Sequence, residues 1–133
     1  MDKKALILIV DDNAEYRELL AWILDQHGFR TISAKCGGEA VSLAIECQPE
    51  LVLMDLSMPG MNGYEATRAI HSHRRGRKIP IVAVSADFAN YGTESWAFEA
   101  GFIACLAKPF APERLLEIMT SVLTRGVERS RAA

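Results

Sequence analysis

The chain has 133 residues and a mass of 14.7 kDa, the size of one ordinary domain, and half of its residues are hydrophobic while 24% are charged. This composition excludes a disordered chain, a collagen-like repeat and a coiled coil. Fifteen Lys and Arg against seventeen Asp and Glu leave a formal net charge of −2, which argues against direct binding of nucleic acid.

Five short segments have the patterns of β-strands, and they lie at residues 5–10, 29–33, 51–54, 81–84 and 103–107. Four of them are continuous apolar runs, which is typical of parallel strands covered by helices on both faces. The segment 29–33 alternates between apolar and polar residues instead. We therefore expect it at an edge of the sheet.

Between these segments the apolar residues recur at helical spacing. In the helix expected at 14–27 the apolar stripe consists of Tyr16, Leu19, Leu20, Ile23 and Leu24. Gly28 marks the end of this helix. Further helices are expected at 38–48, 63–71, 91–100 and 112–123.

The alternation of strands and helices predicts an α/β fold, a (βα)₅ doubly wound parallel sheet with the flavodoxin-like strand order 2-1-3-4-5. Residues 1–124 are expected to form the domain. Residues 125–133 read as a polar tail that is flexible. The apolar run at 5–10 is too short for a signal peptide or a membrane span, so no membrane contact is expected.

Acidic side chains follow two strands of the predicted sheet. Asp11 and Asp12 come directly after the first strand and Asp55 follows the third. In this strand order the two strands are neighbours, so three carboxylates meet at one edge. Packed carboxylates take up protons unless a hard cation such as Mg²⁺ neutralises them. Taken alone, the segment 11–13 is better explained as the cap of the first helix, but Asp55 favours a metal site.

Two further polar residues end strands at the same edge. Ser85 ends the fourth strand and Lys108 follows the fifth. A hydroxyl and an ammonium beside three carboxylates suit a phosphate site, because Mg²⁺ and lysine neutralise phosphoryl oxygens while the hydroxyl donates a hydrogen bond.

These residues resemble the receiver domain of two-component response regulators over about residues 5–124. The resemblance rests on four motifs that occur in the order and at the spacing of that family. They are residues 9–13 (Ile-Val-Asp-Asp-Asn), 53–63 (Leu-Met-Asp-Leu-Ser-Met-Pro-Gly-Met-Asn-Gly), 84–86 (Val-Ser-Ala) and 107–110 (Ala-Lys-Pro-Phe).

The resemblance implies that Asp55 accepts a phosphoryl group from a histidine kinase or a histidine phosphotransfer protein, and that phosphorylation changes partner binding. The implied Mg²⁺ ligands are Asp11, Asp12, Asp55 and the backbone carbonyl of Ser57. The implied contacts of the phosphoryl group are Lys108, the Ser85 hydroxyl and the Ala86 N–H. Such a protein is a signalling phosphoacceptor that assists its own phosphorylation and dephosphorylation, and it is not an enzyme with a separate substrate.

Other functions of this fold fit the residues less well. A phosphatase of the haloacid-dehalogenase type needs an acid two positions after its aspartate, where this chain has Ser57. Flavin binding needs a phosphate-cradling loop where the chain has Asp11 and Asp12, and no GxxxxGK[ST] or GxGxxG element is present. Two alternatives stay open: a receiver excised from a hybrid histidine kinase or longer regulator, and a binding-only pseudo-receiver.

Aromatic residues gather in the segment 88–110, and the family resemblance implies that this region contacts a downstream protein partner or a second copy of the chain. The six are Phe88, Tyr91, Trp96, Phe98, Phe102 and Phe110. The competing interpretation is that most of them fill the core, and Trp96 is then the one expected to be exposed. The basic run at 71–78 reads as a solvated loop, with no nucleic acid as its partner.

The cysteines carry two expectations. Cys36, Cys47 and Cys105 are far apart and form no CxxC pair, so neither a disulfide framework nor a zinc site is predicted, and a cytoplasmic protein fits them. Cys105 also departs from the family resemblance, in which a Tyr or Phe stands three residues before the active-site lysine. A small side chain there implies an altered conformational switch with unaltered phosphorylation chemistry.

Overall fold

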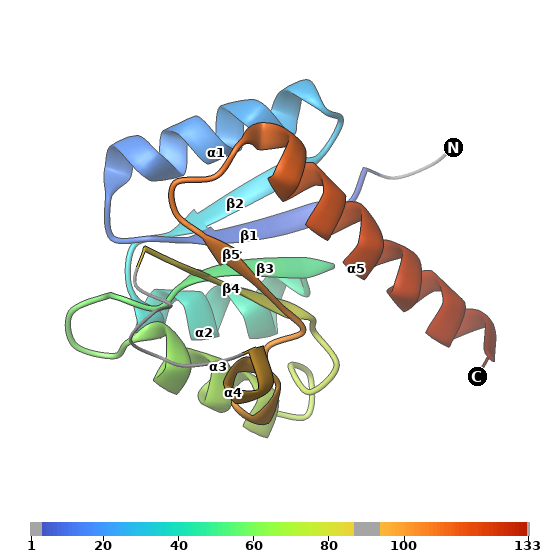
Figure 1. The fold of residues 1–133 in the computed structure, drawn as a ribbon. Helices are drawn as coiled ribbons and strands as arrows, with labels where there is room; N and C mark the ends of the chain where they lie inside the picture. Colours follow the sequence, from blue (N-terminus) through green and yellow to red (C-terminus); the bar gives the residue numbers. More distant parts are fainter. Residues whose placement is uncertain (1–3, 87–93, 133) are drawn as a thin grey trace.

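A computed structural model describes residues 4–86 and 94–132, leaving aside the side chains of 94–96 and 126–132 (Figure 1). The strands are β1 (Leu6–Val10), β2 (Arg30–Ala34), β3 (Leu51–Asp55), β4 (Ile81–Ser85) and β5 (Ala104–Ala107). The helices are α1 (Ala14–Gln26), α2 (Gly37–Cys47), α3 (Gly63–Ser72), α4 (Glu94–Glu99) and α5 (Pro112–Ala132).

The strands form one parallel sheet in the order β2-β1-β3-β4-β5, which confirms the predicted fold. Helices α1 and α5 cover one face of the sheet, and α2, α3 and α4 cover the other (Figure 1). Strand β2 lies at an edge of the sheet, as predicted, and it exposes Arg30 and Ser33. Among the described residues, no helix combines the length and the apolar character needed to cross a membrane.

The central strands supply two separate cores, because successive side chains of a strand point to opposite faces. On β1, Ile7 and Ile9 pack under α1 and α5, whereas Leu8 and Val10 pack under α2 and α3. All four are at most 1% exposed. The core under α2, α3 and α4 contains many small side chains, namely Ala34, Ala40, Ala44, Ala66, Ala83 and Ala97.

Helix α1 begins at Ala14 as predicted and ends at Gln26, one residue before the predicted end, and its buried stripe is narrower than predicted. The side chain of Asn13 caps its start by accepting from the backbone N–H of Tyr16, and Gly28 adopts a φ of 85° just after its end. The buried residues are Leu20, Ile23 and Leu24, whereas Leu19 is 51% exposed. The reason is geometric, because Leu19 lies about 100° around the helix from Leu20, at the border of the face that meets the sheet.

Helices α2 and α3 keep their predicted bounds to within one residue, whereas α5 does not. Helix α4 falls within the predicted 91–100, of which residues 91–93 lie outside the described part. Helix α5 continues to Ala132 rather than ending at 123. Residues 124–132 contain no proline and several good helix formers, with Gly126 as the weakest position, so no strong helix breaker stops the helix in this stretch. The domain boundary at 124 stays a prediction.

Candidate functional site

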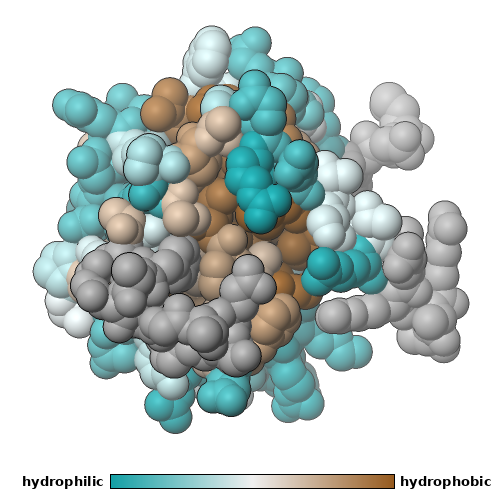
Figure 2. Space-filling view, in the orientation of Figure 1, coloured by the Kyte–Doolittle hydropathy of each residue, from teal (hydrophilic) through white to brown (hydrophobic). Residues whose placement is uncertain are grey.

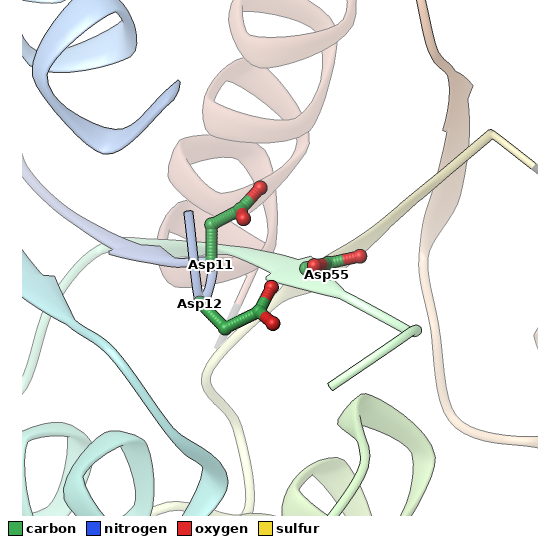
Figure 3. Close-up of side chains that lie close together, drawn as sticks. All are labelled: Asp11, Asp12 and Asp55. Carbon is green, nitrogen blue, oxygen red and sulfur yellow. The ribbon is translucent and has the colours of Figure 1, made fainter. Parts of the chain in front are cut away.

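The carboxyl ends of β1 and β3 bring three aspartates together, as predicted. One carboxylate oxygen each from Asp11, Asp12 and Asp55 lies within 4.8 Å of the other two (Figure 3). Asp11 and Asp55 are buried, whereas Asp12 is exposed. The cluster therefore has a closed side within the protein and an open side toward solvent.

Asp11 is fixed by contacts on three sides. Its Oδ1 accepts from the backbone N–H of Asn13 at 2.9 Å, and its own backbone N–H donates to the carbonyl of Ala34 at 3.2 Å. Its carbonyl accepts from Nη1 of Arg17 at 2.7 Å. These contacts hold Asp11 at the end of β1 and link it to both β2 and the first turn of α1.

Lys108 supplies a positive charge to the cluster. Its Nζ lies 2.7 Å from Oδ2 of Asp11 and 3.9 Å from Oδ1 of Asp55. Its backbone N–H donates to the carbonyl of Ser85 at 2.9 Å, and the peptide bond to Pro109 is cis. The ammonium therefore lies between two strand ends and is closer to Asp11 than to Asp55.

The pKa of Asp55 is raised above its usual value. Burial is the largest cause, and the neighbouring Asp11 and Asp12 carboxylates add to it. The Ser57 N–H, which donates to Oδ1 of Asp55 at 3.1 Å, and the Lys108 ammonium lower the pKa without cancelling these effects. The site thus holds more negative charge than its own cation balances. An all-oxygen donor set of this kind fits a hard divalent cation such as Mg²⁺.

The other predicted site residues lie at the same edge of the sheet. In the strand register Asp55 is paired with Val84 and Ser85 with Ala107, so buried Ser85 lies on the strand between those that carry Asp55 and Lys108. Ala86 follows β4 and is exposed, as is Ser57 after β3. The structure thus brings these residues to one edge, and their roles remain predictions.

Tyr16 belongs to this site, although its sequence context placed it only in the apolar stripe of α1. Its ring centroid lies 4.2 Å from Nζ of Lys108, and Phe110 packs edge-on against it at 6.1 Å between centroids. Burial, followed by the charges of Asp11 and Asp55, raises the pKa of Tyr16 to about 12. The signal in the sequence was its position three residues after the helix cap, because the start of α1 lies at the site's edge of the sheet.

Two glycines after Asp55 act in different ways. We interpret both from their sequence context as sources of backbone freedom, and this is confirmed for Gly60, which has a φ of 74°. It is wrong for Gly63, whose φ is not in the left-handed region. A Cβ on Gly63 would lie 2.9 Å from the carbonyl carbon of Asp55 and from Cα of Leu56, so the requirement there is close approach of backbones.

The aromatic segment 88–110 divides between core and surface. Phe102 is buried, Phe110 is half-buried and Phe98 is 60% exposed. Phe88 and Tyr91 lie outside the described residues, as does the side chain of Trp96, whose predicted exposure is therefore not decided.

A groove of about 400 Å³ lies between α4, β5 and α5, and its lining includes Phe98, Cys105 and Ile118. Hydrophobic surface runs down the middle of this side of the molecule, over β5 (Figure 2). Arg114, Glu117 and Arg125 of α5 add charged groups to the lining. The groove is therefore lined by both apolar and charged side chains.

Comparison with known proteins places this geometry in a family. The sequence model of the family described as the response regulator receiver domain matches residues 7–120. Protein PilH of Pseudomonas aeruginosa is 37% identical over 120 residues, which cover 90% of this chain and 98% of PilH. The polar-differentiation response regulator DivK of Brucella ovis is 35% identical over 117 residues, which cover 88% of this chain and 94% of DivK.

Solved structures agree with this assignment. The receiver domain of the sensor histidine kinase PA1611 from Pseudomonas aeruginosa, which has a magnesium ion coordinated in its active-site cleft, superposes with a TM-score of 0.83 at 32% identity. That alignment covers 92% of this chain and 99% of the other. The chemotaxis protein CheY4 of Vibrio cholerae gives a TM-score of 0.82 at 26% identity, over 90% of this chain and 99% of CheY4. With its sheet order, its acidic cluster and these matches, the chain belongs to the response regulator receiver domain family.

Proposed function

We propose that the protein is the phosphoacceptor receiver of a two-component or phosphorelay pathway, and that Asp55 takes a phosphoryl group from a phosphohistidine of a histidine kinase or a histidine phosphotransfer protein. The observation that carries the proposal is the meeting of Asp11, Asp12 and Asp55 with the Lys108 ammonium at one edge of the sheet. A structural ion pair needs one carboxylate, whereas three carboxylates and a cation suit phosphoryl transfer.

The transfer itself is a displacement at phosphorus. A carboxylate oxygen of Asp55 forms the new P–O bond while the P–N bond to the donor imidazole breaks, and the electron pair of that bond stays with the imidazole. Lys108, with Nζ 3.9 Å from Oδ1 of Asp55, neutralises a phosphoryl oxygen. The Ser85 hydroxyl and the Ala86 N–H donate hydrogen bonds to the same group. The protein thus assists its own phosphorylation, and attack of water on the phosphorus at the same site breaks the P–O bond, releases inorganic phosphate and restores the Asp55 carboxylate.

A divalent cation is part of this proposal. Asp11, Asp12, Asp55 and the Ser57 carbonyl would hold Mg²⁺, which when bound supplies neutralisation of the phosphoryl oxygens. The cation would also act on Asp55 itself, because the pKa of this carboxyl group is raised. Asp55 attacks only as the carboxylate, and a neighbouring positive charge favours the ionised form.

The output of the phosphorylated state is proposed to pass through the segment 88–110 to a downstream protein or a second copy of the chain. The groove between α4, β5 and α5 supports this surface, because exposed Phe98 lines it beside the charged groups of α5. Cys105 lines the same groove at the position where the family resemblance implies an aromatic ring. A cytoplasmic location is also proposed, since exposed thiols at Cys36 and Cys47 suit a reducing compartment.

The test is intact-mass measurement after incubation with acetyl phosphate and Mg²⁺. The wild type should gain one phosphoryl group, and Asp55→Asn should abolish the gain. Asp12→Asn, which leaves the acceptor in place, should slow the reaction and weaken Mg²⁺ binding. Phosphorylation of the Asp55→Asn variant would show that the acceptor is wrong, and an unphosphorylated wild type would favour the binding-only alternative.

A further inference from the structure

We propose that Tyr16 is a positioning residue for Lys108, and that the face of its ring holds the lysine ammonium at the phosphoryl-transfer site. The inference rests on the proposed function for its kinetic consequence. The contact itself rests only on the structure.

In the part of the chain that the structure describes, three groups lie next to the ammonium of Lys108. They are Oδ2 of Asp11 at 2.7 Å, Oδ1 of Asp55 at 3.9 Å and the ring centroid of Tyr16 at 4.2 Å. A cation within about 6 Å of a ring centroid is attracted by the negative face of the ring. Lysine carries its charge on a flexible four-carbon stem, so an isolated lysine does not hold one position. The ring therefore limits where this ammonium lies.

Two contacts that do not involve Lys108 order Tyr16, one through its backbone and one through its ring. The backbone N–H of Tyr16 donates to Oδ1 of Asn13 at 3.0 Å, which fixes the first turn of α1. Phe110 packs against the ring edge-on, with 82° between the ring planes. Edge-to-face packing of this kind is a favoured arrangement of aromatic pairs. Tyr16 thus bridges α1 and the loop after β5, and it meets Lys108 as an already ordered surface.

The Tyr16 ring matters because Asp11 and Asp55, the two carboxylates beside Lys108, also belong to the proposed cation site. Lys108 lies closer to Asp11 than to the acceptor Asp55, and the attraction of Asp11 weakens once a divalent cation shares its charge. The Tyr16 ring is uncharged, since a pKa of about 12 keeps the hydroxyl protonated at neutral pH, and its attraction does not depend on the metal. It would therefore hold the ammonium at the site even where a bound divalent cation shared the charge of the carboxylates.

The kinetic test compares Tyr16→Phe, which keeps the ring, with Tyr16→Leu, which keeps apolar bulk without the ring. The rate of Asp55 phosphorylation by acetyl phosphate should stay within about twofold in Tyr16→Phe and fall by about 5- to 30-fold in Tyr16→Leu. In a Lys108→Ala background, Tyr16→Leu should cause no further loss, because Tyr16 acts through Lys108. An equal loss in both backgrounds would overturn the proposal. If Tyr16→Leu does not fold, Tyr16→Met replaces it.

The second readout uses no phosphodonor and no metal. In ¹H–¹³C NMR spectra, the Lys108 Cε protons should show an upfield ring-current shift in the wild type and in Tyr16→Phe, and the shift should disappear in Tyr16→Leu. An unchanged Lys108 signal in Tyr16→Leu contradicts the contact whatever the kinetics. A wild type that shows the shift but takes up no phosphoryl group contradicts the proposed function and leaves the contact established.

Discussion

Replacing Gly63 by alanine tests how closely α3 must approach the strand that carries Asp55. Gly63 is the first residue of α3, and its N–H lies 3.4 Å from the carbonyl oxygen of Leu56. An added Cβ would collide with the carbonyl group of Asp55 and lie 2.9 Å from Cα of Leu56. These are backbone atoms, so no side-chain rotation relieves the contact. Either α3 or the end of β3 has to move.

Two effects of opposite sign decide the stability of Gly63→Ala. Alanine restricts the unfolded chain more than glycine does, which stabilises the fold by about 0.4–1 kcal/mol where the native backbone accepts it. Overpacking in a tight site costs about 1–3 kcal/mol, and backbone neighbours place this site toward the upper end. We expect a net loss of about 1–2 kcal/mol in the free energy of unfolding. The displaced Asp55 backbone should also slow phosphorylation.

Urea unfolding measures the loss, and Gly38→Ala is the matched control. Gly38 lies in the first turn of α2 with no atom within 4 Å of an added Cβ, so its substitution should stabilise the protein by about 0.4–1 kcal/mol and leave phosphorylation unchanged. A Gly63→Ala variant as stable as Gly38→Ala would refute the reasoning. It would mean that α3 can shift away from Asp55 without cost.

Three further predictions concern the charge of Asp55, the conformational switch at Cys105 and the partner surface at Phe98. The pKa of Asp55 is raised above its usual 3.8. At any pH between 3.8 and the raised pKa, the native state therefore binds more protons than the unfolded state, so the stability of the metal-free protein falls as pH rises through this window. Asp55→Asn should remove this loss, so the variant should be more stable than the wild type at pH 7 but not below pH 3.8. Urea unfolding in the presence of EDTA measures both stabilities. An Asp55→Asn variant that is less stable than the wild type at pH 7 contradicts the prediction. Cys105→Tyr should leave the phosphorylation rate nearly unchanged and change how strongly phosphorylation alters partner affinity; wild-type behaviour in both assays would remove Cys105 from the switch. Phe98→Ser should weaken partner binding or self-association in a pull-down or sedimentation experiment without slowing phosphorylation, and unchanged binding would place the partner surface elsewhere.

The sheet and the acidic cluster could be predicted because their signals are local. Continuous apolar runs locate buried parallel strands, and the polar residues that end them must meet at the carboxyl edge once the strand order is known. Asp11 and Asp55 are therefore readable from the sequence. The raised pKa of Asp55 is not, because it depends on burial by residues from other elements.

The remaining differences have one physical origin, since they depend on distances between segments. The apolar stripe of α1 does not say that Tyr16 lies over Lys108, because that contact needs the loop after β5. A glycine after a turn reads as a source of flexibility, and only the packing of α3 on β3 shows that Gly63 is needed for its size.

The two cores differ in how much sequence change they tolerate. The layer under α2, α3 and α4 includes six buried alanines, among them Ala40, Ala44 and Ala66, and a larger side chain at any of these positions would overpack the space between helix and sheet. The layer under α1 and α5 is built on larger branched side chains such as Leu24 and Leu115, where one shape replaces another at little cost. Sequence drift should therefore accumulate under α1 and α5. A library meant to keep the acidic site working should place its diversity there.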